Sequence, residues 1–577
     1  MKFFLFFLFG SIVVSGNAQL ITRYEQSRFT ETATYEEGMA FYQALEEKYD
    51  EVSIVRHGQT DIEIPLHVVL ISTGNEKTPE DLQQSEKAVW LINNAIHPGE
   101  PDGVSASQLF ARDLMKNREK YQEVLNKVII AIIPFYNIGG VLNRNSTTRV
   151  NQNGPKEYGF RGNARHYDLN RDFIKSDTRN SQSFQEIFHY YDPDLFLDTH
   201  VSNGSDYQHI MTLDYSQKDK MGGKLGKYVD EVFLPYTYSG MKQRGFDAIP
   251  YVNAWGNTPD KGWPQFMDWP RYSTGYTALF HTMGYMSETH MLKTYQQRVE
   301  STYALMETML DFLDEKGEEL LALREETKNT IANQREFEIS WSVDTSTFTS
   351  LTFSGYEPIY VESGISGLKR LKYDRTQPFT KAVKYQDDYK ADKVVTAPRY
   401  YVIPQQWNRV IALLKLNQIE LEQLQTDTTL QVEAYMIDDY ATITSPYEGH
   451  YKHYNVQVTT KQLPIDFRRG DILVPVNQWR NRYIVETLEP EAPDSFFAWN
   501  FFDAILQQKE HFSPYIFEDL AEEILEENPE IRRALETAKA DNAELAASAY
   551  RQLDFIYQRS DYREPEYLRY PVFRMME

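Results

Sequence analysis

The chain of 577 residues contains no cysteine. This absence excludes disulfide bonds, cysteine-ligated zinc and thiol nucleophiles together, so any catalysis must use histidine, carboxylate, hydroxyl or a bound cofactor. Positive charge is also scarce: 60 Lys and Arg stand against 84 Asp and Glu, which gives a formal net charge of −24. Because such a chain repels phosphate backbones, no nucleic-acid partner is expected.

Long apolar runs are absent except at the N-terminus. Lys2 precedes an apolar run from Phe3 to Val14, and small residues then lead to Ala18. This pattern is typical of a secretory signal peptide, whereas a membrane-spanning helix needs about 20 apolar residues. We therefore expect residues 1–18 to be cleaved near Ala18, the chain to be exported to the periplasm or secreted, and the mature chain to have no membrane span. Export without cysteine favours a bacterial source.

Buried strands alternate with helical patterns over residues 19–334. Strands are expected at 68–71, 88–92, 128–133 and 195–197, and helices at 104–121, 181–191 and 295–333. Apolar strands that alternate with helices are typical of an α/β domain in which helices cover both faces of a sheet. The sequence therefore predicts a mixed, largely parallel sheet for this region.

The pattern changes after residue 335. Shorter, half-apolar strands predict a strand-rich α+β accessory region over 335–495, and a helical, acidic region follows over 496–577. Strands are expected at 337–341, 347–353, 400–404, 430–436, 454–460 and 472–476, with an amphipathic run at 406–424. His450 and His453 with Glu448 suggest a second metal site, although such histidines are more often surface residues. No other motif in 335–577 indicates a chemistry, and the oligomeric state cannot be predicted.

Two histidines and a glutamate follow the ends of expected strands. His97 and Glu100 come shortly after residues 88–92, and His200 follows 195–197. Strand ends of an α/β sheet meet at one edge, and a zinc ion with bonds of about 2.0–2.2 Å needs such close ligands. Two His and one Glu would leave the fourth position of a zinc site open for water, as in catalytic sites. Taken singly, each histidine is more often a hydrogen-bonded loop residue.

Two other segments carry groups suited to peptide chemistry. Asn170 and Arg171, in the sequence Asp168-Leu169-Asn170-Arg171, offer an amide and a planar guanidinium that suit a carboxylate. The alternative is a surface arginine paired with Asp172. Glu288 ends another short apolar stretch. Near zinc, a carboxylate can take a proton from water and give it to a leaving amine.

The four segments in this order resemble the zinc metallocarboxypeptidases, the carboxypeptidase A-like family, over roughly residues 36–295. The resemblance implies one Zn²⁺ per chain, held by His97, Glu100 and His200, and a general base at Glu288. It also implies that Asn170 and Arg171 hold the terminal carboxylate of the substrate, and that Asp168 orients a ligand histidine.

The remaining family positions are matched less closely. Residues 137–140 correspond to the turn before the family's catalytic arginine. Arg149 is the candidate for polarising the scissile carbonyl, and Arg144 stays open as an alternative. Tyr276 is the candidate for the substrate-binding tyrosine. Gly99 stands where digestive members carry arginine, and Val201 stands where serine is usual.

The resemblance implies an exported enzyme that hydrolyses the C-terminal peptide bond by metal-activated water, with a peptide or protein carrying a free C-terminus as substrate. Two alternatives keep the metal: a deacylase or amidase of the aspartoacylase type, and a hydrolase of peptidoglycan stem peptides. A catalytically silent binding module is the third class. It is disfavoured because all four candidate metal and base residues are present.

Overall fold

The computed structural model describes residues 20–577 except 75 and 77, so the expected signal peptide lies outside the described residues. Its centre is an eight-stranded sheet in the order β1-β2-β4-β3-β5-β9-β6-β7. The pairs β4–β3, β3–β5, β5–β9 and β6–β7 are parallel, and the others are antiparallel. The strands are β1 (Val52–Gln59), β2 (Pro65–Ile71), β3 (Ala88–Asn93), β4 (Val128–Ile133), β5 (Leu195–Ser202), β6 (Met211–Tyr215), β7 (Ile249–Pro250) and β9 (Met283–His290).

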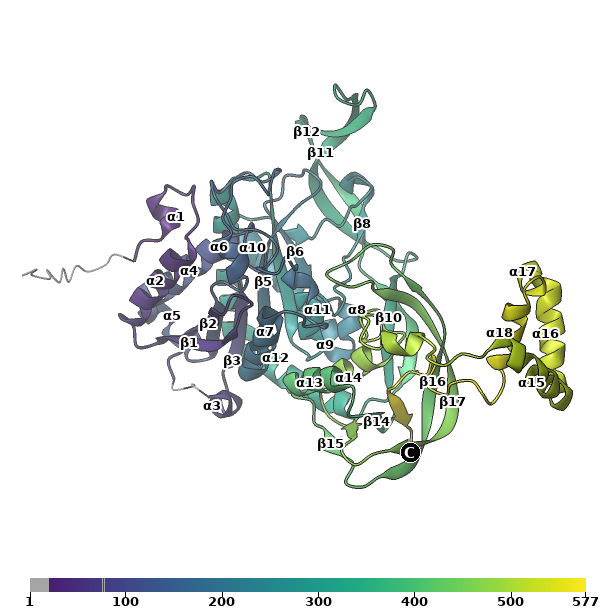
Figure 1. Cartoon of the computed structure of the whole chain (residues 1–577). Helices are drawn as coiled ribbons and strands as arrows, with labels where there is room; N and C mark the ends of the chain where they lie inside the picture. The colour runs from purple at the N-terminus through teal and green to yellow at the C-terminus, as the bar shows by residue number, and fades with distance from the viewer. Residues whose placement is uncertain (1–19, 75, 77) are drawn as a thin grey trace, which may run out of the picture.

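Successive side chains of each central strand enter two different cores, because side chains alternate across a sheet. In β3, Val89 and Leu91 join one core, while Ala88, Trp90 and Ile92 join the other. Helices cover both faces (Figure 1). The Trp90 face is covered by α2 (Tyr35–Glu46), α4 (Asp102–Lys116), α5 (Arg118–Leu125), α9 (Gly223–Tyr228), α10 (Leu234–Gln243) and α12 (Tyr295–Ala332). The other face is covered by α7 (Arg179–Tyr191), α11 (Ser273–Ala278) and elements of the accessory region.

The expected mixed, largely parallel α/β sheet is confirmed. All four expected strands form, and the expected helix over 104–121 is divided at Asn117 into α4 and α5. The long helix α12 begins with a capping box, in which Thr294 accepts from the backbone of Gln297 and Gln297 accepts from the backbone of Thr294. Three residues separate the end of this helix from β10, so the expected boundary at 334/335 lies between two elements.

The accessory region forms a second sheet of six strands in the order β15-β18-β14-β19-β16-β17. Its strands are β14 (Tyr400–Ile403), β15 (Glu422–Gln423), β16 (Thr428–Thr442), β17 (His453–Phe467), β18 (Ile472–Pro475) and β19 (Phe573–Met575). Helices α13 (Asn408–Leu416) and α14 (Asn481–Leu488) connect it to the α/β domain that ends with α12. The strand β10 (Glu336–Val343) pairs separately with β13 (Tyr389–Thr396).

The α/β domain and the accessory region share one apolar core. It runs from Phe184 and Phe188 of α7 to Leu414 of α13 and Tyr483 of α14. Within this core, Asn417 donates to the hydroxyl of Tyr483 at 2.9 Å and accepts from the hydroxyl of Tyr276 at 2.7 Å. A buried amide with such partners fixes the relative position of the packed elements. The accessory region is therefore part of the folded body.

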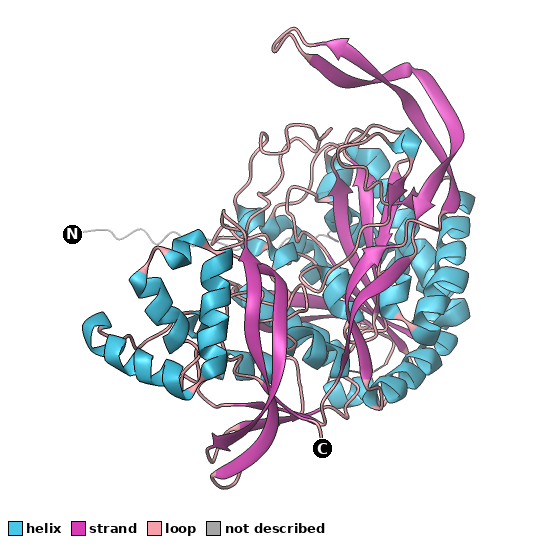
Figure 2. Ribbon diagram, turned by 90° about the vertical axis from the view of Figure 1, so that its right-hand side faces the viewer, coloured by secondary structure: helices cyan, strands magenta, loops and turns pink. Residues whose placement is uncertain are grey.

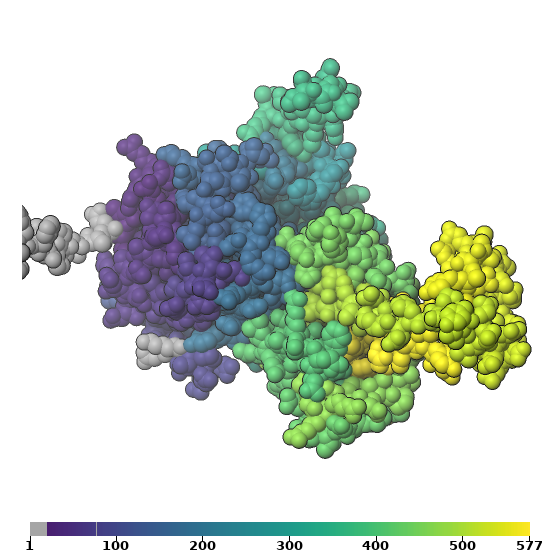
Figure 3. Space-filling model, in the orientation of Figure 1, coloured from purple at the N-terminus to yellow at the C-terminus, as the bar shows by residue number. Residues whose placement is uncertain are grey.

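Two parts project from this body (Figures 1 and 2). One is the hairpin of β11 (Thr349–Glu362) and β12 (Lys369–Gln386), whose base pairs with β8 (Trp263–Pro264). The other is a lobe of α15 (Pro514–Glu527), α16 (Pro529–Asp541), α17 (Ala543–Ala546) and α18 (Ala549–Tyr557), with its own small core. Figure 3 shows this lobe as a distinct yellow knob.

The C-terminal end differs from the helical region expected over 496–577. After the helical lobe the chain returns to the second sheet, where β19 lies between β14 and β16. A strand of three residues is too short for its alternation to be recognised in the sequence. No helix within the described residues has the length and apolarity needed to cross a bilayer.

Candidate metal centre and catalytic cavity

The candidate site lies where β3, β5 and β9 end. His200 in β5 and Glu288 in β9 are register partners in parallel strands, so their side chains project from the same face. His97 and Glu100 follow β3, the other neighbour of β5. The sheet order therefore brings together residues that are up to 191 positions apart.

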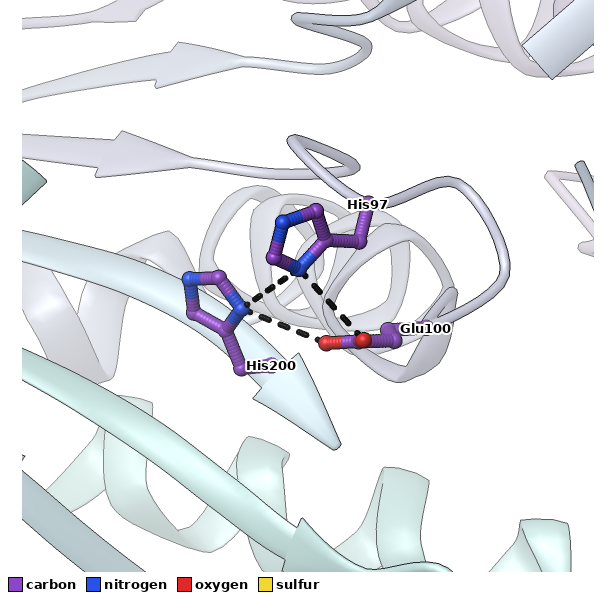
Figure 4. Close-up of side chains that lie close together, drawn as sticks. All are labelled: His97, Glu100 and His200. Carbon is purple, nitrogen blue, oxygen red and sulfur yellow. Dashed lines mark hydrogen bonds and ion pairs between the residues drawn. The ribbon is translucent and has the colours of Figure 1, made fainter. Parts of the chain in front are cut away.

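His97, Glu100 and His200 face one another with little space between them (Figure 4). The two Nδ1 atoms lie 3.2 Å apart; His97 Nδ1 lies 3.4 Å from one Glu100 oxygen, and His200 Nδ1 lies 3.2 Å from the other. All three residues are at most 3% exposed. Within the described chain this is the one group of three or more histidine, aspartate or glutamate side chains whose ligand atoms converge closely enough to hold a metal ion.

The Nε2 edge of each imidazole, which faces away from the converging Nδ1 atoms, lies against a carboxylate. Asp168 Oδ1 lies 2.9 Å from His97 Nε2, and Asp198 Oδ2 lies 3.0 Å from His200 Nε2. When a carboxylate holds Nε2–H, the lone pair is left on Nδ1, which is the form that binds a metal. The sequence alone did not point to a role for Asp198. Its signal is its position two residues before His200, on the same face of the strand.

These residues fit Zn²⁺ well. Two imidazoles and one carboxylate converge at their lone pairs, and both rings are oriented by carboxylates. Such a donor set is that of a catalytic zinc site. His450 and His453, in contrast, do not form a second site: His450 Nε2 lies 2.7 Å from Asp177, while His453 contacts Thr442 and Asp503.

Glu288 borders the same cavity, which has a volume of about 430 Å³. Burial raises the pKa of Glu288 to about 7, with the charge of Glu100 adding to this effect and His200 and Arg149 opposing it. A carboxyl group with a pKa near neutrality can both accept and return a proton.

Of the two arginines considered, Arg149 lies at the cavity and Arg144 does not. Arg149 Nη1 lies 2.6 Å from Glu100 Oε1 and its Nη2 donates to Val201 O at 3.2 Å. The guanidinium of Arg144 instead donates to the backbone oxygens of Ala33 and Glu157. Gly99 makes room for Arg149, because a β-carbon at residue 99 would lie 3.0 Å from Arg149 Cγ.

A third arginine, Arg161, also borders the cavity and was missed from the sequence. Its guanidinium lies 3.3 Å from Glu100 and 2.8 Å from Asp168. With burial opposing them, the charges of His97 and Arg161 hold the pKa of Asp168 well below its usual range. The sequence offers a weak signal for Arg161, since it precedes Arg171 by only ten residues.

Asn170 and Arg171 line the cavity together. Asp168 caps their short turn by accepting from the backbone nitrogen of Asn170 at 2.9 Å. Asn170 Oδ1 accepts from Ser273 N at 2.9 Å, which fixes the amide. The guanidinium of Arg171 lies 4.5 Å above the ring of Tyr272 and donates to Asn170 O at 2.7 Å.

Tyr276 does not reach this cavity, which corrects the expectation that it binds substrate. Its side chain is completely buried in the core shared with the accessory region, and its hydroxyl donates to Asn417. Tyr276 is buried there because it lies in α11, on the side that packs against α7 and faces away from the strand ends. The tyrosines that line the cavity are Tyr251 and Tyr272.

Asp214 of β6 is a further acidic group at the cavity, and no pattern in the sequence pointed to it. It is 3% exposed, and burial together with the charges of Asp268 and Glu288 raises its pKa well above the usual range. Within the described part of the chain Asp214 takes part in no ion pair. The charge of Lys220 lowers the pKa of Asp214 only slightly, because Lys220 is paired with Asp268 at 2.6 Å.

The part of the chain that holds these residues is similar to known carboxypeptidases. Residues 39–320 match the family model described as zinc carboxypeptidase. The chain is similar to Carboxypeptidase 2 of Trichophyton equinum, with 21% identity over 426 residues, which are 71% of this chain and 72% of that protein. It is also similar to Carboxypeptidase 2 of Trichophyton tonsurans, with 22% identity over 446 residues, again 71% of this chain and 72% of the relative.

Solved structures with similarity include a metallo-carboxypeptidase from Burkholderia cenocepacia, at 14% identity and a TM-score of 0.38, covering 49% of this chain and 70% of that one. Another is the carboxypeptidase A from Helicoverpa armigera, at 14% identity and a TM-score of 0.36, covering 48% of this chain and 74% of that one.

Proposed function

Through residues 39–320 the chain belongs to the zinc carboxypeptidase family of peptide hydrolases, and we propose that it is an exported carboxypeptidase acting on peptides with a free C-terminus. The observation that carries this proposal is one cavity bordered by the His97, Glu100 and His200 group, by Glu288 and by Arg171. Export is supported by the signal-peptide pattern of residues 1–18. N-terminal sequencing of the exported protein tests it, with Gln19 as the expected first residue.

In this mechanism each group has a separate task. Bound Zn²⁺ would act as a Lewis acid toward water and the scissile carbonyl. Glu288 takes a proton from the attacking water and gives it to the leaving amine nitrogen. Arg171, with Asn170 beside it, holds the terminal carboxylate, since a guanidinium forms paired hydrogen bonds with such a group. Arg149 stabilises negative charge on the carbonyl oxygen.

The cavity also favours a substrate with a basic side chain at its C-terminus. Asp214 is buried at the cavity and takes part in no ion pair within the described chain. A buried carboxylate is costly unless a cation accompanies it. A lysine or arginine side chain of the substrate would supply that cation, as would the diamino acid of a peptidoglycan stem peptide.

One peptide screen tests these proposals. Peptides that end in lysine, phenylalanine or glutamate are supplied with a free or an amidated C-terminus, and the products are identified by mass spectrometry. We expect release of one terminal residue from the free peptides, fastest for lysine, and none from the amidated ones. Equal cleavage of amidated peptides, or a preference for N-acyl amino acids, would favour the amidase alternative.

A further inference from the structure

The hairpin of β11 and β12 is anchored at its base, and its outer part projects from the body (Figure 2). At the base, Phe353 and Val383 pack with Trp263 in a small apolar core. Tyr207, in the loop after β5, belongs to the same core and forms a bridge with Gly355. The outer part therefore extends from a fixed support beside the catalytic domain.

Two large apolar side chains stand at the apex of the hairpin. Ile365 is 101% exposed and Leu368 is 71% exposed, and both lie in the loop that joins β11 to β12. Next to this loop, Tyr360 pairs with Leu371 across the two strands and is 62% exposed. Single exposed apolar residues are common on protein surfaces, but a group of them at the end of a projecting element indicates a contact surface.

The loop that carries Ile365 is ordered by its own hydrogen bonds. Ser363 N donates to Leu368 O at 2.9 Å, and Gly367 N donates to Ser363 O at 2.9 Å. The hydroxyl of Ser363 accepts from Ile365 N and from Ser366 N, both at 3.2 Å. The hydroxyl of Ser366 accepts from Leu368 N at 3.2 Å. Because a backbone N–H is costly to remove from water unless it has such a partner, this apex can leave water at a small cost.

Positive charge lies directly behind the apolar apex. Residues 359–372 contain three basic residues, Lys369, Arg370 and Lys372, and one acidic residue, Glu362. Glu362 is the register partner of Lys369, so Arg370 and Lys372 are left as excess cations. All three basic residues are exposed. This outer part of the hairpin is therefore positive, in a chain whose formal net charge is −24.

The length of the hairpin separates the positive apex from the acidic body. The stretch from Tyr356 to Ile365 spans about 30 Å when extended, at about 3.3 Å per residue. Charges at physiological salt are screened beyond a Debye length of about 8 Å. The acidic body, and the pair Glu357 and Asp374 at the base end of this stretch, therefore hardly oppose contact of the apex with an anionic surface.

We propose that the apex of this hairpin docks on the surface of an anionic lipid membrane. Ile365 and Leu368 enter the boundary between the headgroups and the acyl chains, while Arg370 and Lys372 contact the lipid phosphates. A fluid surface suits a convex apex with few apolar side chains because the lipids close around it, whereas a protein partner must offer a matching pocket. The contact holds the catalytic domain beside a membrane, and it does not depend on the proposed carboxypeptidase function.

Sedimentation with lipid vesicles tests this proposal. The protein used begins at Gln19, since the apolar run from Phe3 to Val14 would bind lipid by itself. Vesicles of equal parts phosphatidylglycerol and phosphatidylcholine are compared with vesicles of phosphatidylcholine alone. We expect the protein to sediment with the anionic vesicles at low salt and to be released at high salt. Equal binding to both kinds of vesicle, or binding to neither, overturns the proposal.

The apolar contribution is tested by combining Ile365→Ser with Leu368→Ser. We expect the affinity for anionic vesicles to fall about tenfold or more, because neither side chain then gains by leaving water. The control combines Tyr515→Ser with Ile516→Ser, at two exposed apolar positions of the helical lobe, and should bind as the wild type does. A loss of binding in the control and not in the hairpin variant would assign the contact to the lobe and overturn the proposal.

The contribution of charge is tested by combining Arg370→Gln with Lys372→Gln. We expect the affinity for anionic vesicles to fall about 10- to 30-fold and to depend less on salt. Lys116→Gln with Lys415→Gln, at two exposed basic positions of the body, is the control and should change neither property. An unchanged affinity in the hairpin variant overturns the proposal. So does a dimer of the wild-type chain, formed without lipid, that the same hairpin substitutions abolish, since the apex would then bind a second copy.

Discussion

Asp198 Oδ2 lies 3.0 Å from His200 Nε2, on the edge of the ring opposite the atom that faces His97. Asp198 is itself held by Ser273 Oγ at 2.6 Å and by the amide of Asn93 at 3.0 Å. Three elements therefore fix the orientation of one candidate ligand. The ring needs no rearrangement to present Nδ1 to a metal ion.

Replacement of this carboxylate should weaken metal binding. In Asp198→Asn the charge opposite His200 is lost, and we expect zinc affinity to fall about 10- to 100-fold, as is usual when such a partner is removed. Competition with a chelator measures the affinity. Asp247→Asn, at a largely exposed position, is the control and should bind zinc as the wild type does. Equal affinities for both variants would contradict the role of Asp198.

Glu288 should be needed for hydrolysis but not for the metal. Glu288→Gln keeps the size and the polarity of the side chain while removing the group that accepts a proton. We expect about one zinc per chain and a fall in kcat of about 10²- to 10⁴-fold. Metal analysis and initial rates test this. The control is Glu338→Gln, since Glu338 is exposed. Full activity of Glu288→Gln would refute the mechanism.

Arg149 and Arg144 should differ strongly, although they are only five residues apart. Arg149→Gln is expected to lower kcat about 10²- to 10³-fold, the usual effect of removing one group that stabilises the developing oxyanion. Arg144→Gln should leave kcat unchanged, because its guanidinium holds backbone oxygens outside the cavity. Arg161→Gln belongs in the same series, since its guanidinium borders the cavity too. A normal kcat in Arg149→Gln, with a large loss in Arg161→Gln, would transfer the role to Arg161.

Much of the fold was predictable because its central strands are apolar on both faces. The run from Val128 to Ile133 has no polar residue, and such a run in a folded chain fits a buried parallel strand. His97, Glu100 and His200 were predictable because they lie at or just beyond the ends of such strands and, together with the other two segments in this order, resemble one family.

Other parts depend on contacts between residues distant in sequence, which no local pattern reveals. Tyr276 was expected at the site, but α11 packs it against Asn417, 141 residues further along the chain. Asp214 reaches the cavity only because β6 pairs with β9. It is an ordinary aspartate until that pairing is known.

Asp214 should determine which terminal residue is preferred. In Asp214→Asn the carboxylate available to a substrate cation is lost, so we expect kcat/KM for lysine-terminated peptides to fall about 10- to 100-fold. Peptides ending in phenylalanine should be cleaved as well as before, or better, since the variant no longer buries a carboxyl group without a neighbouring cation. Competition between the two peptides in one reaction measures the ratio directly. An unchanged ratio would exclude Asp214 from substrate selection.

Acid should destabilise the folded chain partly through His281, which lies in the core beside the accessory region. His281 is 1% exposed, and its Nε2 lies 2.9 Å from Trp479 O. Burial lowers its pKa from 6.5 to about 3. Between these two values the unfolded chain binds a proton that the folded chain does not. Stability must therefore fall as the pH drops below 6.5, by up to about 1.4 kcal/mol per pH unit from this residue.

His281→Asn tests this dependence, because asparagine tolerates the left-handed φ of +61° at this position and does not titrate. The free energy of unfolding is measured by urea denaturation at pH 7 and pH 5 for the wild type, for this variant and for the exposed-site control His511→Asn. The variant is expected to be less stable at pH 7, where it lacks the hydrogen bond to Trp479. Between pH 7 and pH 5 it should nevertheless lose about 2 kcal/mol less than the other two proteins. Equal losses in all three would show that His281 does not remain neutral in the folded chain.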